Sequence, residues 1–196
     1  MPQLRINTMP DPEIKVKIQK IKVLISDVDG VLTDGSIYIS SDGSELKRFS
    51  VEDGAGAALA RVSGLPVAFI SGRYSEATAI RLNEMKINHI YQGQMNKTVP
   101  FENLLYTFGV RPEHVAYIGD GLVDLPVMER CGLKIAPPQS HPLVLESADI
   151  ITRTRGGEGA FREAVEIILK SQDRYLLTLE KMRREVYMKN SGDPSA

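Results

Sequence analysis

The feature that most constrains the fold of this chain is a series of short apolar runs that alternate with stretches of helical pattern. The runs are rich in Val and Ile and mostly lack polar alternation, so each is predicted to be a strand buried on both faces of a parallel sheet. The predicted strands cover Ile21–Ser26, Pro66–Ser71, Asn88–Tyr91, Val115–Gly119, Leu133–Ala136 and Asp149–Ile151. Predicted helices lie near residues 54–63, 75–86, 98–108, 123–130, 141–147 and 158–172. This order predicts an α/β fold with a doubly wound, mostly parallel, Rossmann-like sheet.

One segment breaks the alternation directly after the first strand. Residues 36–40 and 45–49 flank Ser41-Asp42-Gly43-Ser44, and Asp-Gly between two alternating runs is typical of a β-hairpin. A chain of 196 residues is long enough for one domain with a full core but short for two. We therefore expect a flexible N-terminal extension over residues 1–18, one α/β domain over 19–172, and a C-terminal helix and tail over 173–196.

The C-terminal stretch carries an apolar helical stripe. Tyr175, Leu179, Met182 and Val186 follow one another at spacings of four, three and four residues. Two interpretations stay open, because the stripe can pack on its own domain or form a contact between subunits.

Charge and composition exclude several classes of partner. The net charge is −1, so no global basic field favours a nucleic acid or an anionic membrane. No apolar run reaches the roughly 18 residues that cross a bilayer. The first residues, MPQLRINTMPDPEIKVK, are too polar for a signal peptide, and the single cysteine, Cys131, excludes an internal disulfide. We expect a cytoplasmic protein that binds neither nucleic acid nor membrane.

Acidic residues gather where predicted strands end. Asp27 and Asp29 follow the first strand, and their spacing of two sends both side chains to one side of an extended chain. Gly30 lets the backbone turn sharply beside them. Asp120 and Asp124 follow the fourth predicted strand. The carboxyl ends of parallel strands are the edge where ligands bind in such sheets, so these acids are predicted to share a site.

Phosphate-binding groups lie at the same edge. Ser71, Gly72 and Arg73 follow the second predicted strand and offer a hydroxyl, an amide and a guanidinium. Lys97 opens a predicted helix after the third strand. Each residue alone has a structural interpretation, as a helix cap or a solvated side chain. Their coincidence at one edge favours a common site over separate caps.

These residues resemble the four motifs of the haloacid dehalogenase superfamily of phosphatases. The matching elements are DVDGVLTDG, SGR, Lys97 and GDGLVD, in the right order over roughly residues 20–170. Within the superfamily the chain is similar to the 3-deoxy-D-manno-octulosonate 8-phosphate phosphatase family in the stretches KRFSVEDGAG, YQGQMNK, HVAYIGDGLVDLPVM and GGEGAFRE. The resemblance implies a Mg²⁺-dependent hydrolase of this phosphorylated sugar acid, in the synthesis of lipopolysaccharide precursors.

The resemblance also assigns catalytic roles. Asp27 would attack phosphorus to give an aspartyl-phosphate. Asp29 would protonate the departing sugar oxygen and then deprotonate the hydrolytic water. Lys97, Ser71 and the Gly72 amide would bind the phosphoryl oxygens.

The implied Mg²⁺ would be held by the carboxylates of Asp27 and Asp120 and by the backbone carbonyl of Asp29. Asp124 would lie close behind the ion. The family often has a second acid at the position of Gly121, so the water network there is expected to differ. We assign no chemistry to Asp34, for which a turn or hairpin-entry role is expected.

Substrate recognition is expected to use the remaining predicted site residues. No segment is long enough for a cap domain, and the resemblance implies a homotetramer with hairpins around an axis and a neighbour's tail over the site. Arg73 would pair with the substrate carboxylate. Phe49 and Asp53 would line the sugar pocket, although Phe49 fits the core equally well. The residues that could add contacts are Arg155, Arg162 and the loop 156–159.

Three alternatives stay open. The first is a phosphatase for a nine-carbon sugar acid phosphate, a class that tends to carry an acid where Arg73 stands. The second is a non-catalytic assembly domain, against which the complete set of acids argues. The third is a phospho-acceptor signalling domain, which would not need Asp29 to speed hydrolysis.

Overall fold

Six short parallel strands form the central sheet. The computed structural model describes residues 11–190, with side chains as far as residue 184. The strands are β1 (Val23–Ser26), β4 (Val67–Ile70), β5 (His89–Tyr91), β6 (Val115–Ile118), β7 (Leu133–Ala136) and β8 (Ile150–Ile151). They pair in parallel in the order β5-β4-β1-β6-β7-β8. Each lies within a predicted strand, so the doubly wound α/β fold is confirmed.

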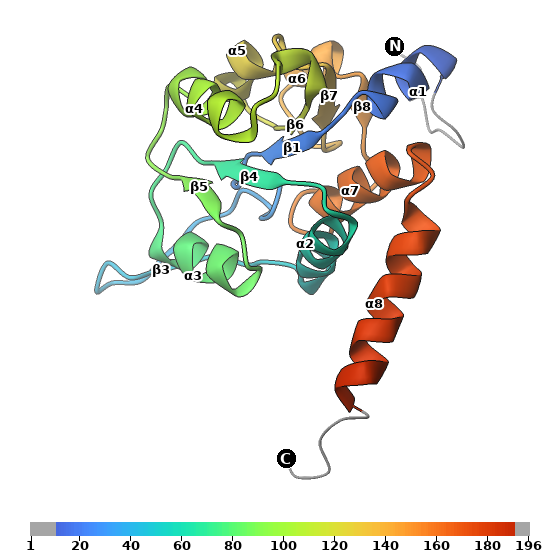
Figure 1. The fold of residues 1–196 in the computed structure, drawn as a ribbon. Helices are drawn as coiled ribbons and strands as arrows, with labels where there is room; N and C mark the ends of the chain where they lie inside the picture. The colour runs from blue at the N-terminus through green and yellow to red at the C-terminus, as the bar shows by residue number, and fades with distance from the viewer. Residues whose placement is uncertain (1–10, 191–196) are drawn as a thin grey trace.

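Helices cover both faces of this sheet, as Figure 1 shows. They are α1 (Pro12–Gln19), α2 (Val51–Ser63), α3 (Glu76–Glu84), α4 (Thr98–Phe108), α5 (Leu125–Met128), α6 (Pro142–Ser147), α7 (Ala160–Ser171) and α8 (Tyr175–Asn190). Leu24 of β1 belongs to the core cluster under α2, α3 and α7, whereas Val23 and Ile25 belong to the cluster under α4, α5 and α6. Because successive side chains of a strand point to opposite faces and both faces are covered, β1 is buried at every position.

Local capping sets the helix boundaries. Helix α2 begins at Val51, three residues before the predicted start, because the Ser50 hydroxyl accepts a hydrogen bond from the Glu52 amide at 3.1 Å. It ends at Ser63 and is capped by Gly64, which adopts a left-handed conformation with φ of 73°. The helix predicted near 123–130 is in fact a 3₁₀ turn (Leu122–Asp124) followed by the single turn of α5.

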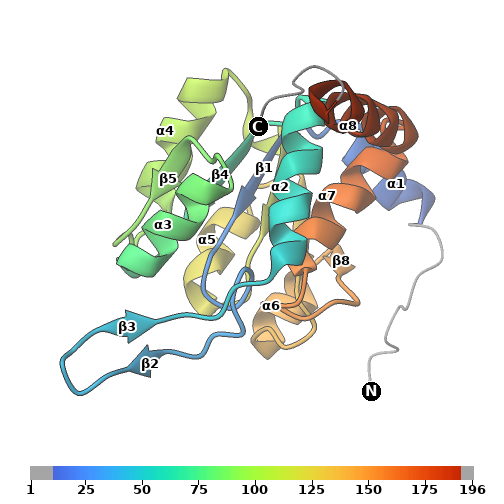
Figure 2. The same ribbon diagram turned by 90° about the horizontal axis from the view of Figure 1, so that it is seen from below.

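The predicted hairpin is confirmed. Strands β2 (Tyr38–Ile39) and β3 (Glu45–Leu46) pair antiparallel, and Gly43 turns the chain with φ of +84°. Figure 2 shows the hairpin projecting from the body of the domain. The side chains of Tyr38, Ile39 and Leu46 are exposed on it. No cap domain is inserted anywhere in residues 11–190, and no helix there is both long enough and apolar enough to cross a membrane.

The N-terminal region differs from the expected flexible extension over residues 12–18. These residues form α1, which buries Ile18 completely. The Gln172 side-chain amide fixes the end of this helix by donating hydrogen bonds to the carbonyls of Ile18 (3.0 Å) and Ile21 (2.8 Å). The expectation for residues 1–10 lies outside the described part of the chain.

Helix α8 leaves the domain body beside α2 and α7 (Figure 1). Tyr175, Leu179 and Met182 pack against the core cluster of the same chain, which confirms the first interpretation of the stripe for these three residues. The side chain of Val186 and the tail at 191–196 lie outside the described residues.

Candidate active site

The order of the strands brings the predicted site residues to one edge of the sheet. Strand β1 lies between β4 and β6. Asp27, Ser71 and Asp120 follow these three strands, and the Asp27 amide donates a hydrogen bond to the Ile118 carbonyl at 2.9 Å. The chain reaches β4 on one side of β1 and returns to β6 on the other, which is where such sheets open a crevice for ligands.

Three carboxylates form the centre of the site. Asp27, Asp120 and Asp124 each offer an oxygen, and these oxygens all lie within 4.8 Å of one another. Asp27 and Asp124 are buried, and Asp120 is half-buried. Carboxylate oxygens are the ligands that Mg²⁺ prefers, so this donor set fits the expected ion. The predicted contribution of Asp29 is its backbone carbonyl, and its carboxylate lies outside the cluster.

Lys97 lies against two of these acids. Its side chain is completely buried, and Nζ lies 2.7 Å from Oδ1 of Asp27 and 2.7 Å from Oδ1 of Asp124. Burial alone lowers the pKa of Lys97, but the two carboxylates outweigh burial and the net pKa is raised. Lys97 is therefore a firmly protonated cation beside Asp27.

The single ammonium group of Lys97 does not balance the charge of the three clustered acids. Burial raises the pKa of Asp27 well above its ordinary value, and the charge of Asp124 adds to this effect. Burial, followed by Asp124, raises the pKa of Asp120 to about 7. Both carboxyl groups therefore resist ionisation, and a divalent cation among them would offset the excess negative charge.

Asp124 is held by four hydrogen bonds, one of them from a residue that the sequence did not reveal. Its Oδ1 accepts from Lys97 and from the buried Tyr117 hydroxyl, each at 2.7 Å, and its Oδ2 accepts from the amides of Asp120 (3.1 Å) and Gly121 (3.0 Å). The carboxylate is therefore locked in orientation. The sequence feature that could have indicated Tyr117 is its place as the one tyrosine in the otherwise aliphatic strand β6, which leads into the acidic motif.

Close backbone approaches shape the loop after β1. Gly30 has φ of +86°, and a Cβ atom there would lie 2.0 Å from Oδ2 of Asp120. Gly156 lies against the same loop, since its Cβ would meet the Gly30 carbonyl at 1.9 Å. Gln139, which the sequence did not reveal, bridges the two glycines by donating to the Gly30 carbonyl (2.8 Å) and accepting from the Gly156 amide (3.2 Å).

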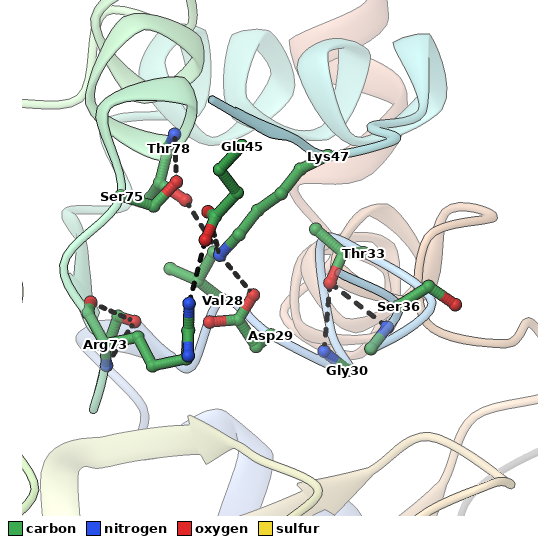
Figure 3. A network of polar contacts seen from close by, with 12 residues as sticks. Val28, Asp29, Gly30, Thr33, Ser36, Glu45, Lys47, Arg73, Ser75 and Thr78 are labelled. Atoms are coloured by element: carbon green, nitrogen blue, oxygen red, sulfur yellow. Dashed lines mark hydrogen bonds and ion pairs between the residues drawn. The ribbon is translucent and has the colours of Figure 1, made fainter. Parts of the chain in front are cut away.

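The Ser71-Gly72-Arg73 segment follows β4. Ser71 is buried, and its hydroxyl donates to the Arg73 carbonyl (2.9 Å) while accepting from the Arg73 amide (3.2 Å). The Arg73 side chain is half-exposed, and its Nη2 donates to Oε2 of Glu45 on the hairpin at 2.8 Å. Figure 3 shows this contact between the hairpin and the site.

The hairpin also reaches Asp29. Nζ of Lys47 lies 2.5 Å from Oδ1 of Asp29 (Figure 3). Neither Lys47 nor Glu45 was among the predicted site residues. At the entry to the hairpin, Asp34 accepts a hydrogen bond from the Ser36 amide at 2.9 Å, in agreement with its expected turn role.

The structure does not bring Phe49 and Asp53 to the acidic cluster. Phe49 packs against the core under α2 and α7, which is the alternative that the sequence left open. Asp53 is buried, its Oδ1 accepts from the Arg162 amide at the start of α7 (3.2 Å), and burial raises its pKa to about 6. Arg162 itself pairs with Glu52 and Glu166. These contacts do not support the predicted place of Asp53 in a sugar pocket.

Comparisons with known proteins all point to phosphatases of one superfamily. The family model described as haloacid dehalogenase-like hydrolase matches residues 66–162. The chain is 46% identical over 160 residues to the 3-deoxy-D-manno-octulosonate 8-phosphate phosphatase KdsC of Escherichia coli strain K12, which covers 82% of this chain and 85% of that protein.

Solved structures agree with this grouping. The phosphatase of the same name from Yersinia pestis superimposes with a TM-score of 0.82 at 44% identity, covering 84% of this chain and 89% of that one. The one from Moraxella catarrhalis, in complex with a magnesium ion, a phosphate ion and a KDO molecule, gives a TM-score of 0.83 at 39% identity, covering 87% and 98%.

Proposed function

The chain belongs to the 3-deoxy-D-manno-octulosonate 8-phosphate phosphatase family of haloacid dehalogenase-like hydrolases, and from this membership we propose that it hydrolyses that phosphorylated sugar acid with Mg²⁺ as cofactor. The products would be the free eight-carbon sugar acid and phosphate, in the supply of lipopolysaccharide precursors. The observation that carries the proposal is the buried contact of Lys97 with Asp27 and Asp124, beside Asp120.

Asp27 acts as the nucleophile in this proposal. An oxygen of its carboxylate attacks phosphorus, the bond from phosphorus to the sugar oxygen breaks, and an aspartyl-phosphate forms on Asp27. Lys97 supports the step because its charge lies 2.7 Å from Oδ1 of Asp27 and offsets the repulsion between two anions. Ser71 and the Gly72 amide bind phosphoryl oxygens.

Asp29 acts as the acid and base. It gives a proton to the departing sugar oxygen and then takes one from the water that hydrolyses the aspartyl-phosphate. Its place two residues after Asp27 allows it to serve both steps.

The residues that would hold Mg²⁺ are Asp27, Asp120 and the Asp29 carbonyl, with Asp124 behind them. When bound, the ion would neutralise negative charge on the phosphoryl group and on the attacking carboxylate. Asp124, locked by Tyr117, Lys97 and two amides, keeps the cluster in place when the ion leaves.

Arg73 supplies specificity in this proposal by pairing with the substrate carboxylate. Nη2 of Arg73 already donates a hydrogen bond to Oε2 of Glu45 at 2.8 Å. A substrate carboxylate would therefore share Arg73 with Glu45 or displace Glu45 from it. Without a cap domain, closure of the site falls to other subunits of a homotetramer, whose contacts would use the exposed hairpin side chains.

The test is an assay of phosphate release with Mg²⁺ on three substrates. They are the eight-carbon sugar acid 8-phosphate, a nine-carbon sugar acid 9-phosphate and a hexose 6-phosphate that lacks a carboxylate. We expect the highest kcat/KM for the first, and no turnover for Asp27→Asn with any of them. Arg73→Met should lower kcat/KM for the sugar acids far more than for the hexose, whereas Arg111→Met, at an exposed arginine beside Glu113, should change nothing. Turnover of non-acidic sugars alone would refute the proposed substrate.

A further inference from the structure

The segment that leaves the hairpin carries two charged residues toward the site. Glu45 and Lys47 are two residues apart, so their side chains lie on the same side of the extended chain. Leu46 and Arg48, which point the other way, are exposed. As Figure 3 shows, Glu45 reaches Arg73 and Lys47 reaches Asp29.

Lys47 has three polar neighbours, and their distances from Nζ show which of them makes the strongest contact. Its Nζ lies 2.5 Å from Oδ1 of Asp29, 3.4 Å from Oγ1 of Thr78 and 3.8 Å from Oε1 of Glu45. Oε1 of Glu45 is buried, but its distance from Nζ is too long for a hydrogen bond. The strong, charge-assisted bond of Lys47 therefore goes to Asp29.

The Lys47 ammonium is buried, whereas the Asp29 carboxylate is partly exposed. The side chain of Lys47 has no exposed surface, so its ammonium depends on protein partners rather than water. Asp29 is a quarter exposed, and in the described part of the chain only Oδ1 of its carboxylate has a partner. One oxygen is anchored, and the other has no hydrogen-bond partner within residues 11–184, which leaves it available to exchange a proton with a ligand.

The Glu45–Arg73 pair fixes the other end of the same segment. Glu45 is joined to the loop after β4 and Lys47 to the loop after β1, so in the substrate-free protein two ion pairs hold the segment against both loops. The position of Lys47 is therefore set by the site itself and not by the exposed tip of the hairpin.

We propose that Lys47 is the positioning residue of Asp29, and that it acts on catalysis only by holding Oδ1 of that carboxylate. This inference rests on the proposed function of Asp29. A carboxylate freed from Lys47 samples other rotamers, and a displacement of about 1 Å in a reacting group is enough to cost roughly 100-fold in rate.

The first test compares Lys47→Met with the wild-type enzyme under saturating Mg²⁺, using the eight-carbon sugar acid 8-phosphate. We expect kcat to fall by about 100-fold while KM changes by less than about threefold, because a residue that acts only through Asp29 leaves substrate binding almost unchanged. Lys47→Arg, which keeps a cation, should retain more activity than Lys47→Met. Arg48→Met removes the next positive charge, whose exposed side chain points away, and should leave both constants unchanged.

The second test is a double-variant cycle with Asp29→Asn. If Lys47 acts only through Asp29, Lys47→Met added to Asp29→Asn should cause no further loss of kcat. A multiplied loss, or a change in KM alone, would overturn the inference. Lys47→Gln serves in the same cycle should Lys47→Met not fold, as judged by circular dichroism. Failure of the proposed function is distinguishable, because the wild-type enzyme would then show no turnover of this substrate.

Discussion

Tyr117 offers a test of how the acidic cluster is held at the level of a single hydroxyl. Tyr117→Phe keeps the ring in the core but removes the hydrogen bond to Oδ1 of Asp124. Because partners of metal ligands typically contribute 10- to 100-fold in affinity, we expect Mg²⁺ binding to weaken by at least about tenfold. Calorimetric titration measures the change. Tyr106→Phe, at a tyrosine exposed on α4, is the matched control, and equal affinities for the two variants would contradict the prediction.

The raised pKa of Asp120 predicts how the affinity for Mg²⁺ depends on pH. Burial raises the pKa of this carboxyl to about 7 in the metal-free protein, and a ligand must lose its proton before it binds the ion. Affinity should therefore fall as the pH drops below about 7, with protons released on binding. Titrations at pH 6 and pH 8, in buffers of different ionisation enthalpy, measure both effects. An affinity independent of pH would contradict this account.

The raised pKa of Asp53 predicts that the free energy of unfolding depends on pH. Its pKa is raised from 3.8 to about 6 by burial, so the folded chain holds this proton more tightly than the unfolded chain does. Relative to Asp53→Asn, the wild-type protein should lose free energy of unfolding as the pH rises from about 4 to about 6. The loss should level off at roughly 3 kcal/mol. Urea unfolding of both proteins at pH 4.5 and pH 7 tests this, and a constant difference would refute it.

The sequence predicted those site residues whose reactive side chains lie at the end of a strand or at the start of a helix. Asp27, Asp120 and Lys97 follow strands or open a helix, so the parallel sheet alone predicts that they share an edge. Lys47 and Gln139 were missed because their partners lie 18 and 109 residues away along the chain. No local pattern indicates which loop will lie across another.

At the scale of elements, α1 shows how tertiary contacts can stabilise a segment with a weak local signal. We expect Ile18→Ala to lower the free energy of unfolding by about 2–5 kcal/mol, because the side chain is fully buried beneath α7. Val16→Ala removes an exposed side chain from the same helix and should have little effect. Chemical denaturation compares the two, and equal stabilities would mean that α1 does not contribute to the core.

The strands and most helices were predictable because their apolar periodicity is strong. Helix α1 was not, since Ile18 is its single fully buried residue and the contact that fixes its end comes from Gln172. The start of α2 was placed too late because Ser50, as a cap, extends the helix beyond its apolar pattern. Tertiary contacts and caps therefore account for both differences.

At the scale of the whole molecule, the hairpin is the surface that we expect to join subunits. Ile39 and Leu46 are about two-thirds exposed on a hairpin whose tip projects away from the rest of residues 11–190 (Figure 2). Ile39→Lys should convert the proposed tetramer to smaller species and lower kcat/KM, since closure of the site depends on the assembly. Light scattering coupled to size-exclusion chromatography measures the mass. Tyr106→Lys, at an exposed site on α4, should leave the mass unchanged.

The place of β1 between β4 and β6 has a consequence for biosynthesis. Residues up to the end of β5 can pair on one side of β1, yet Asp27 still lacks the acids that arrive with β6. A nascent chain therefore has no hydrolytic capacity until β6 has left the ribosome and docked. Appearance of activity during translation would report the moment at which the second half of the polypeptide joins the first.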